Sequence, residues 1–257
     1  MITLISPAKT LDLDSKIPMV EASSYAFNSE SVRIMKKLKS LSRKKIAELM
    51  NLSEKLANLN YQRFHMWSEN PDDENLRQAI FMFKGEVYLG LDAPNLKTEE
   101  LQFAQNHLRI LSGLYGYLKP LDEIQPYRLE MGTGIAVGRN KNLYQFWGRK
   151  IAQLINLELK NQEEQTIVNL ASNEYFKAVN PKEIKGGIIT PIFKDYKNGN
   201  YKVISFFAKN ARGVMAKWII QNKIEKASDL IHFNENGYRF NELMSTSNDF
   251  VFTREQT

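Results

Sequence analysis

The sequence predicts a protein of the α+β class, with strands and helices mixed in a single domain that spans residues 1–257. Three observations support this prediction. The 257 residues are 43% hydrophobic, which is enough to bury a sizeable core. Short apolar runs typical of strands interleave irregularly with the i, i+3, i+4 apolar spacing typical of helices. No repeat, low-complexity run or linker divides the chain, so we expect one domain.

The first expected element is a buried strand over residues 2–5, which Pro7 ends. Polar residues, Lys9 among them, follow at the carboxyl end of this strand. Ligand loops gather at that end in mixed α/β structures, although a plain strand exit has the same pattern. Residues 14–28 are expected to form a loop.

Residues 30–67 have a helical pattern of apolar side chains. Ser42 and Ser53 are suited to cap helix starts. We therefore expect a short helix over 42–49, a tight turn at Met50-Asn51-Leu52 and a second helix from about residue 54.

The middle of the chain is expected to alternate between helices and strands. The apolar spacing predicts helices at 76–83, 98–107 and 142–160, the last strongly amphipathic. Strands are expected at 108–111 and 127–131.

The last third of the chain carries the best hairpin turn, Asn198-Gly199. We expect this turn to join strands near 187–194 and 201–207, and a helix to follow over 209–222. Further strands are expected at 166–170, 237–241 and 250–254.

The composition excludes several classes of protein. The chain has no cysteine, which rules out disulfides, Cys–Zn sites, iron–sulfur clusters and thiol catalysis. The mean hydropathy is −0.42, and neither a run of about 18 apolar residues nor a signal-peptide pattern is present. We therefore expect a cytoplasmic protein without a membrane partner, and nothing in the sequence indicates an obligate protein partner.

The positive charge is concentrated in one segment. Residues 30–63 hold nine Lys and Arg against three Glu, an excess of six, which equals the formal net charge of the whole chain. A basic segment on a neutral body is typical of a polyanion contact, because each neutralised phosphate releases counterions. A solvated helical face is the alternative interpretation.

Arg43, Lys44 and Lys45 fall in the first turn after the Ser42 cap. Cations there oppose the helix dipole at a cost of about 0.3–1 kcal/mol each when exposed. The cost is smaller if the helix runs continuously from residue 30, and a bound phosphate would offset it. The arrangement supports an anionic partner.

Five stretches combine glycine or small residues with aromatic and charged ones in a way that packing alone does not require. They are residues 83–85, 112–116, 126–132, 169–177 and 205–213. Arg128, Lys177, Lys209 and Arg212 are suited to bind phosphate, and the tyrosines could stack on bases or sugars. Each stretch alone is more often a turn, but together they indicate a shared polar cleft.

Other residue patterns give no catalytic or metal site. The three histidines lack metal-ligand spacing, and no nucleophile-elbow pattern supports a Ser–His–Asp triad. Asp12 and Asp14 are a weak signal for Mg²⁺, and Gly132-Thr133-Gly134 is not followed by a helix as a dinucleotide loop would be. We therefore expect neither a metal nor a cofactor.

These stretches also carry a family resemblance. Residues 5–12 (ISPAKTLD), 108–132, 143–148, 169–177 and 206–213 resemble the YaaA family of bacterial peroxide-stress proteins, in the same order over nearly the whole chain. The resemblance implies a cytoplasmic protein that helps cells survive hydrogen peroxide by limiting free iron and oxidative DNA damage. It also implies a family-specific mixed α/β fold with a positively charged cleft. A helix–hairpin–helix element would bind DNA without marked sequence preference.

Carried over to this chain, the helix–hairpin–helix falls on residues 42–63, with 50–53 as the hairpin. This is the segment that holds the charge excess. One residue departs from the family pattern, because Asn51 stands where such hairpins usually have glycine. Asn tolerates left-handed backbone geometry better than most residues, but the phosphate contact becomes less secure.

The leading hypothesis is therefore a non-enzymatic protein that binds duplex or branched DNA. The residues expected to contact DNA are Arg43, Lys44, Lys45, Asn51, Ser53, Lys55 and Arg63 on the helices, and Lys9, Arg128, Lys177, Lys209 and Arg212 in the cleft.

The alternative is an enzyme acting on a small phosphorylated or nucleotide substrate, with a Glu as general base. Its site would comprise Lys9, Arg128, Glu130, Ser172, Glu174 and Lys209. A weaker hypothesis, direct sequestration of iron, lacks both Cys and suitable His/Glu spacing.

Overall fold

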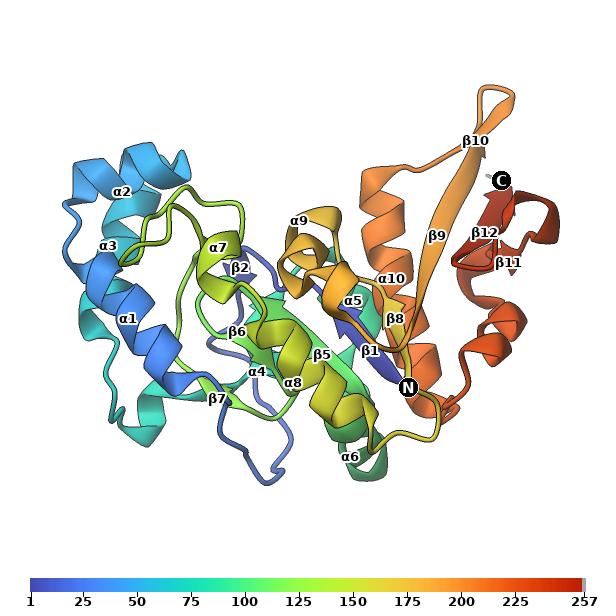
Figure 1. The fold of residues 1–257 in the computed structure, drawn as a ribbon, viewed down its shortest axis with the longest axis horizontal. Helices are drawn as coiled ribbons and strands as arrows, with labels where there is room; N and C mark the ends of the chain where they lie inside the picture. Colours follow the sequence, from blue (N-terminus) through green and yellow to red (C-terminus); the bar gives the residue numbers. More distant parts are fainter. Residues whose placement is uncertain (256–257) are drawn as a thin grey trace.

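A mixed eight-stranded sheet forms the centre of the protein in the computed structural model, which describes residues 1–255 (Figure 1). Seven strands follow the order β11-β12-β9-β8-β1-β5-β6, and β10 pairs with β9 outside this path. The strands are β1 (Ile2–Ile5), β5 (Leu108–Ser112), β6 (Gly116–Leu118), β8 (Thr166–Asn169), β9 (Gly187–Lys197), β10 (Asn200–Lys202), β11 (Arg239–Phe240) and β12 (Asp249–Glu255).

Strand β1 occupies the middle of this sheet. It pairs in parallel with β5 on one side, where Thr3 lies opposite Leu108, and with β8 on the other, where Thr3 lies opposite Val168. All four residues of β1 are buried, as expected for a parallel strand covered on both faces. Because β8 also pairs in parallel with β9, and β9 with β12, five neighbouring strands run in the same direction and their carboxyl ends lie at one edge of the sheet.

The helices cover the sheet from both sides. Helix α10 (Ser205–Gln221) packs on α5 (Glu86–Leu91) and α6 (Thr98–His107), and it also contacts β1 and β9. Helix α8 (Lys150–Leu159) lies in front of the sheet in Figure 1. The connections that lead into β5 and β8 therefore approach β1 from different faces.

Three helices, α1 (Asn28–Lys39), α2 (Arg43–Met50) and α3 (Glu54–Met66), lie together at one end of the long axis (Figure 1). Two buried hydrogen bonds fix them to the body. The Ser31 hydroxyl of α1 donates to the Leu114 carbonyl at 3.1 Å, and the Trp67 indole N–H after α3 donates to the Tyr115 hydroxyl at 3.0 Å.

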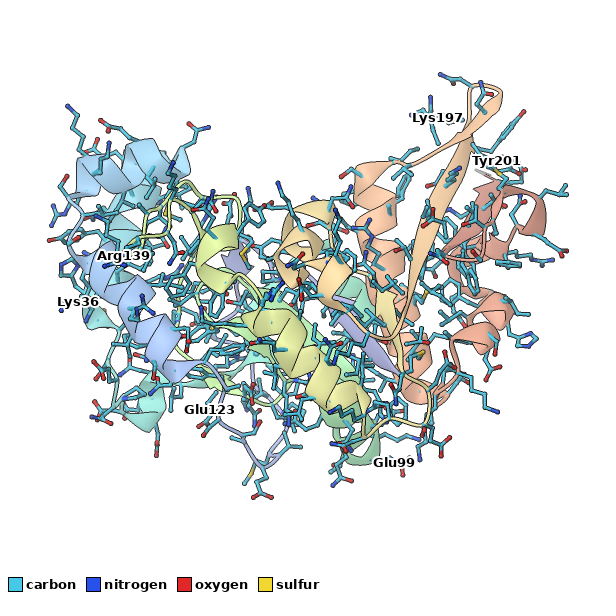
Figure 2. All side chains as sticks on the ribbon, viewed as in Figure 1. Lys36, Glu99, Glu123, Arg139, Lys197 and Tyr201 are labelled. Atoms are coloured by element: carbon cyan, nitrogen blue, oxygen red, sulfur yellow. The ribbon has the colours of Figure 1, made fainter. Side chains whose placement is uncertain are left out.

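The remaining elements are short. The hairpin of β9 and β10 projects at the other end of the molecule, where Figure 2 labels Lys197 and Tyr201. Two small antiparallel ladders pair β2 with β4 and β3 with β7. The short strands and helices are β2 (Thr10–Leu11), β3 (Arg77–Gln78), β4 (Phe83–Lys84), β7 (Glu123–Ile124), α4 (Ala79–Met82), α7 (Leu143–Trp147) and α9 (Asn173–Phe176).

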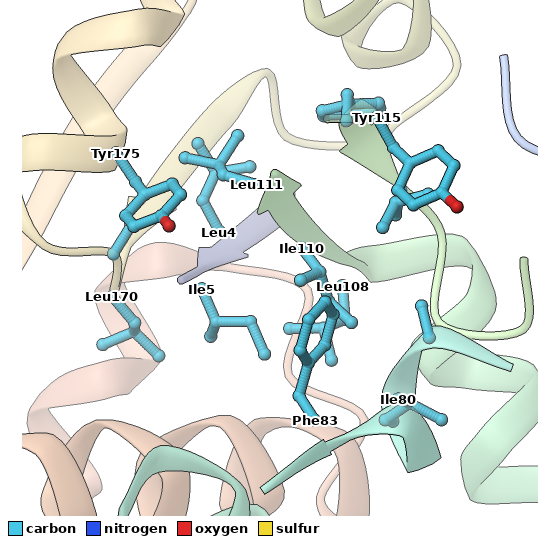
Figure 3. Packing of buried hydrophobic residues seen from close by; sticks show 14 of the residues in the cluster. Leu4, Ile5, Ile80, Phe83, Leu108, Ile110, Leu111, Tyr115, Leu170 and Tyr175 are labelled. Atoms are coloured by element: carbon cyan, nitrogen blue, oxygen red, sulfur yellow. The ribbon is translucent and has the colours of Figure 1, made fainter. Parts of the chain in front are cut away.

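Buried apolar side chains from β1, β5, β8 and the surrounding helices belong to one continuous cluster. Figure 3 shows Leu4, Ile110 and Leu170 close together, with the rings of Phe83 and Tyr175 beside them. Burial of a Leu or Ile side chain contributes about 1.5–3 kcal/mol, so this cluster is the main source of stability.

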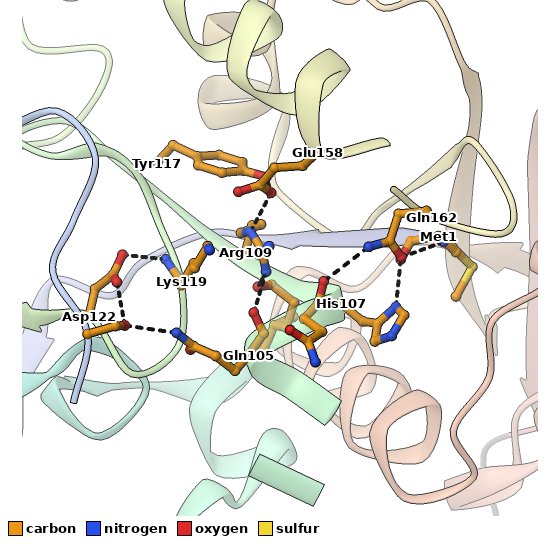
Figure 4. A network of polar contacts seen from close by, with 12 residues as sticks. Met1, Gln105, His107, Arg109, Tyr117, Lys119, Asp122, Glu158 and Gln162 are labelled. Atoms are coloured by element: carbon orange, nitrogen blue, oxygen red, sulfur yellow. Dashed lines mark hydrogen bonds and ion pairs between the residues drawn. The ribbon is translucent and has the colours of Figure 1, made fainter. Parts of the chain in front are cut away.

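Arg109 on β5 forms a buried ion pair with α8 and also bonds to the end of α6 (Figure 4). The Arg109 guanidinium on β5 donates to the Glu158 carboxylate of α8 at 2.8 Å and to the Gln105 carbonyl of α6 at 2.9 Å. The Tyr117 hydroxyl donates to the same Glu158 oxygen at 2.6 Å. Because these groups are satisfied, Arg109 can be 3% exposed without an unpaired buried charge.

Most expected elements are confirmed, and four expectations need correction. The helix expected at 142–160 is two helices, because Gly148 has a positive φ of 50° that ends α7. The strand expected at 127–131 is not one; this segment is extended without a ladder partner. Only Ala79–Met82 of the expected 76–83 helix is helical, and residues 205–207, expected in a strand, begin α10.

Helices α5 and α10 approach each other so closely that glycine is required at the crossing. A Cβ added at Gly213 would lie 1.8 Å from the Val87 carbonyl oxygen, and one at Gly90 would lie 2.3 Å from the Asn210 carbonyl oxygen. Neither backbone can move without displacing its helix.

We expect Gly213→Ala to lower the free energy of unfolding by about 2 kcal/mol or more, because overpacking outweighs the helix propensity gained by alanine. Chemical denaturation measures this. Gly134→Ala is the control, since a Cβ there has no atom within 4 Å, and it should change stability by less than about 0.5 kcal/mol. Equal stability of the two variants would contradict the close approach.

Burial also raises the pKa of core tyrosines, among them Tyr127, whose hydroxyl lies 2.6 Å from that of Ser112. A phenol with a raised pKa in the folded state stabilises the protein fully below the unfolded pKa of about 10. This contribution is lost as the pH rises toward the folded value. We therefore expect stability to fall above pH 10 by about 1.4 kcal/mol per pH unit for each such tyrosine.

Denaturation curves at pH 9, 10 and 11 test this expectation. Tyr127→Phe should make the decline of the free energy of unfolding shallower by about 1.4 kcal/mol per pH unit, the contribution expected of one tyrosine. The control Tyr196→Phe changes an exposed ring and should leave the slope unchanged. An identical slope in Tyr127→Phe and the parent would refute the assignment.

Candidate nucleic-acid interface and strand-end cavity

In the second part of the basic segment, α2 and α3 are joined by a three-residue turn. The Ser42 hydroxyl accepts a hydrogen bond from the Lys45 N–H at 3.3 Å and caps α2. Asn51 ends this helix in the left-handed conformation, with φ 48° and ψ 57°. The Ser53 hydroxyl then caps α3 by accepting from the Leu56 N–H at 3.4 Å. The caps and the turn lie where the sequence predicts them.

The helix is interrupted between α1, which ends at Lys39, and α2, which begins at Arg43. One continuous helix from residue 30 is therefore not formed. Arg43, Lys44 and Lys45 therefore occupy the first turn of α2, which contains no acidic residue. Their charges oppose the helix dipole.

Three of the expected cations, Arg43, Lys44 and Lys55, line a hollow of about 770 Å³ between α2 and α3. The Arg43 guanidinium also lies 5.0 Å from the centre of the Tyr61 ring. Lys45 pairs instead with Glu48 at 3.3 Å. Arg63 is half-buried on α3, and this burial lowers the pKa of its guanidinium.

Further cations lie beside this helix pair. Figure 2 places Lys36 and Arg139 at the same end of the molecule as α2 and α3. The loop that carries Arg139 lies against α1, since a Cβ at Gly138 would be 3.5 Å from Arg33 Nη2. The basic surface thus extends beyond the segment 30–63.

A second hollow, of about 440 Å³, lies at the carboxyl ends of β1 and β8. We call it the strand-end cavity. Four of the five stretches singled out in the sequence contribute to its lining. The polar or charged side chains that line it are Ser6, Lys9, Thr10, Lys84, Glu86, Tyr88, Glu130, Ser172, Glu174, Tyr175, Lys209 and Arg212.

The fifth stretch, residues 112–116, lies beneath the cavity rather than in it. The Ser112 hydroxyl bonds to the Tyr127 hydroxyl, and both residues are buried. The expected polar cleft is thus made by four stretches together with the segment after β1. Glu86 and Tyr88 of α5 were not expected to line it. The close approach that places them depends on Gly90 and Gly213, which the sequence pattern does not relate to each other.

Ion pairs engage Lys9 and Lys84 of the cavity lining, and also Arg128, which lies beside the cavity rather than in it. Glu130 binds Lys9 at 3.0 Å through Oε2 and Arg128 at 3.0 Å through Oε1. Lys84 pairs with Asp12 at 3.4 Å. The Asp12 pKa is lowered to about 2, chiefly because its carboxylate accepts hydrogen bonds from the backbone and the hydroxyl of Ser15.

Lys209 and Arg212 of α10 differ from this group, because neither has a carboxylate within ion-pair distance among residues 1–255. Arg212 is largely shielded from solvent, and desolvation lowers the pKa of its guanidinium. The cavity therefore contains two cations without an anionic partner.

Lys177 lies outside the lining of the cavity. Its ammonium group is 4.9 Å from the centre of the Tyr144 ring, and the Tyr144 hydroxyl donates to the Glu174 carbonyl at 3.1 Å. Within residues 1–255, no side chain lines both the α2–α3 hollow and the strand-end cavity. The expected DNA-contact residues thus form two separate groups.

The histidines bond to nearby backbone in two cases: His65 to the Tyr61 carbonyl and His107 to the Met1 carbonyl. No cluster of three His, Asp or Glu side chains with metal-binding geometry occurs in the described part of the chain. Within residues 1–255, no helix is both long and apolar enough to cross a bilayer.

The chain is similar over its full length to several bacterial proteins. It is 54% identical over 256 residues to a UPF0246 protein of Aliivibrio fischeri strain MJ11, covering 100% of this chain and 99% of that one. It is 51% identical to a UPF0246 protein of Saccharophagus degradans and 51% identical to one of Shewanella sediminis, with 100% of each chain covered.

Residues 1–244 match the family described as peroxide stress protein YaaA, the family that the sequence motifs resemble. The matched range includes both α2–α3 and all the residues that line the strand-end cavity. With such a match over most of the chain, and relatives at about half identity over all of it, this protein belongs to the YaaA family of peroxide stress proteins.

Proposed function

We propose that this protein binds DNA in the cytoplasm as part of the peroxide stress response, and that it limits oxidative damage linked to intracellular free iron. Membership of a family named for peroxide stress supports the physiological context. The charge of these helices supports DNA as the partner, since α2 and α3 hold five Lys and Arg against two Glu, and the neighbouring α1 holds four against one.

The first turn of α2 carries the proposal. Free backbone N–H groups at a helix start already favour an anion, and here Arg43 and Lys44 add two cations without a carboxylate partner in residues 1–255. This arrangement is unfavourable in isolation and becomes favourable once a phosphate binds.

The turn after α2 supplies a second contact. Asn51 has the left-handed geometry for which glycine is usual in helix–hairpin–helix elements, and Ser53 begins the next helix immediately afterwards. We propose that residues 42–63 form such an element, with Asn51 and Ser53 near one phosphate and Lys55 near the next.

These groups would contact phosphates rather than base edges, so we expect little sequence preference for duplex or branched DNA. Arg63, Lys177, Lys209 and Arg212 are expected to contribute further positive charge. Lys9 and Arg128 contribute less, because Glu130 pairs with both and offsets one of their two charges.

Charge reversal of Arg43, Lys44 and Lys45 to Glu tests the proposal. We expect DNA affinity of the parent to fall steeply with salt, and the slope of log K against log salt to decrease by roughly 3 in the variant. Mobility-shift titrations at several salt concentrations measure both slopes.

The control reverses Lys160, Lys223 and Lys226, which are exposed and distant in sequence from α2, and it changes the net charge equally. If both triple variants lose the same affinity, or if binding by the parent is independent of salt, the proposed contact is wrong.

The enzyme alternative has one observation in its favour, since the strand-end cavity brings together Lys9, Glu130, Ser172, Glu174 and Lys209. It is supported less well because a general base needs a free carboxylate oxygen, and both Glu130 oxygens are engaged by cations. The role would fall to Glu174, whose Oε1 accepts the Gly132 N–H at 2.8 Å and whose Oε2 is left free within residues 1–255. A product-forming activity that is lost in Glu174→Gln would restore this alternative.

A further inference from the structure

The strand-end cavity lies where the sheet topology favours a ligand. Strand β1 has parallel neighbours on both sides, and the helices that lead into these neighbours, α6 and α8, lie on different faces (Figure 1). In open α/β sheets the loops diverge at such a point and leave a crevice beyond the carboxyl ends of the strands. Here that crevice is lined by Ser6, which follows β1, and by Ser172, which follows β8.

The two serines fix the floor of the cavity. The Ser172 N–H donates to the Ser6 hydroxyl at 2.9 Å, and the two hydroxyls lie 3.3 Å apart. This contact holds the two strand ends together, and it places hydroxyl groups that can donate or accept hydrogen bonds beside a ligand.

The cations of the cavity that remain unpaired come from α10. Arg212 lies one turn after Lys209, and no hydrogen bond or ion pair from its guanidinium occurs within residues 1–255. A half-buried guanidinium without a partner is unfavourable, since desolvated charges are normally paired. A bound anion would remove this cost, and a guanidinium is suited to bind two phosphate oxygens at once.

The rest of the lining is suited to a larger molecule than inorganic phosphate. A volume of about 440 Å³ falls in the range of small-molecule sites. Glu174 presents a second carboxylate oxygen besides the one that accepts from Gly132, and Glu86 adds another carboxylate. Tyr88 and Tyr175 add aromatic edges. Carboxylates bind hydroxyl and amino donors, as sugars and bases provide.

We propose that the strand-end cavity binds a single nucleoside monophosphate unit, with the phosphate on Arg212 and Lys209 and the nucleoside toward Glu174 and Ser6. The site is distinct from the α2–α3 surface and does not require that surface to bind DNA. The unit has two chemically equivalent sources, a free mononucleotide or an unpaired nucleotide of a DNA strand.

Isothermal titration with each of the four 2′-deoxynucleoside 5′-monophosphates tests the site. We expect at least one of them to bind, and the matching nucleoside and inorganic phosphate to bind more weakly. Arg212→Gln should weaken binding by about 10-fold or more, as expected for a lost hydrogen bond to a charged group. The control Lys160→Gln removes an exposed cation elsewhere and should bind like the parent.

Thermal unfolding separates a binding role from a structural one. If Arg212 serves to bind an anion and makes no stabilising contact without one, the unliganded Arg212→Gln protein should unfold at the same temperature as the parent or higher. The substitution removes an unpaired, partly desolvated charge. Arg212→Lys keeps the charge and should retain part of the affinity. A clear loss of stability in unliganded Arg212→Lys and Arg212→Gln, without loss of nucleotide affinity, would overturn the proposal.

The two sources are distinguished with DNA duplexes that differ by one unpaired nucleotide. Tighter binding of the bulged duplex in the parent but not in Arg212→Gln identifies the DNA nucleotide. Equal binding of both duplexes, with neither duplex displacing the mononucleotide from the cavity, identifies the free mononucleotide.

The Arg43, Lys44, Lys45 charge-reversal variant keeps the two proposals separate. It should bind mononucleotides like the parent even if it no longer binds DNA. If no mononucleotide binds the parent at millimolar concentration and the bulge adds nothing, the cavity proposal fails while the DNA proposal stands.

Discussion

The parallel pairing of β1 with both β5 and β8 is the constraint on which the rest of the structure depends. It joins three segments more than fifty residues apart in sequence, and it buries β1 completely. Because the three strands run in the same direction, their carboxyl ends lie at one edge and deliver Ser6 and Ser172 to the same cavity. The Arg109–Glu158 ion pair then holds α8 to this sheet, and Arg109 also donates to the Gln105 carbonyl of α6. Long-range pairing of this kind must be paid for in loop-closure entropy, which the continuous apolar core offsets.

The positive charge of the protein has two different roles in the fold. On α2 and α3 most of the cations are exposed and outnumber the acidic residues Glu48 and Glu54, so they create a field that extends beyond the protein. Around the strand-end cavity, Lys9 and Arg128 both pair with Glu130, whereas Lys209 and Arg212 have no carboxylate partner in residues 1–255. The first arrangement suits a long polyanion, whereas the second suits one small anionic group in a shielded site.

Local elements were predictable where their cause is local. Ser42 and Ser53 cap their helices, Asn51 takes the left-handed turn, and Asn198-Gly199 forms a hairpin with positive φ at both residues, all from short-range chemistry. The predicted elements were wrong where tertiary contacts determine the local structure. The apolar stripe of 142–160 continues across Gly148, so periodicity alone gives no reason for the break. Residues 127–131 have a strand-like pattern, but they pack against the turn at Gly113 instead of joining a ladder.

The sequence by itself determined the mixed α/β class, the concentration of charge in residues 30–63 and the identity of the family, because each depends on composition, local periodicity or motif order. It also indicated which stretches contain unusual polar chemistry. Only the tertiary structure decided that four of those stretches surround one cavity while 112–116 lies beneath it. It also decided that the cavity is separate from the α2–α3 hollow and that Arg212, unlike Arg128, lacks a carboxylate partner in residues 1–255. The reason is physical: pairing and burial depend on which distant segments the sheet brings together, and no local pattern encodes that distance.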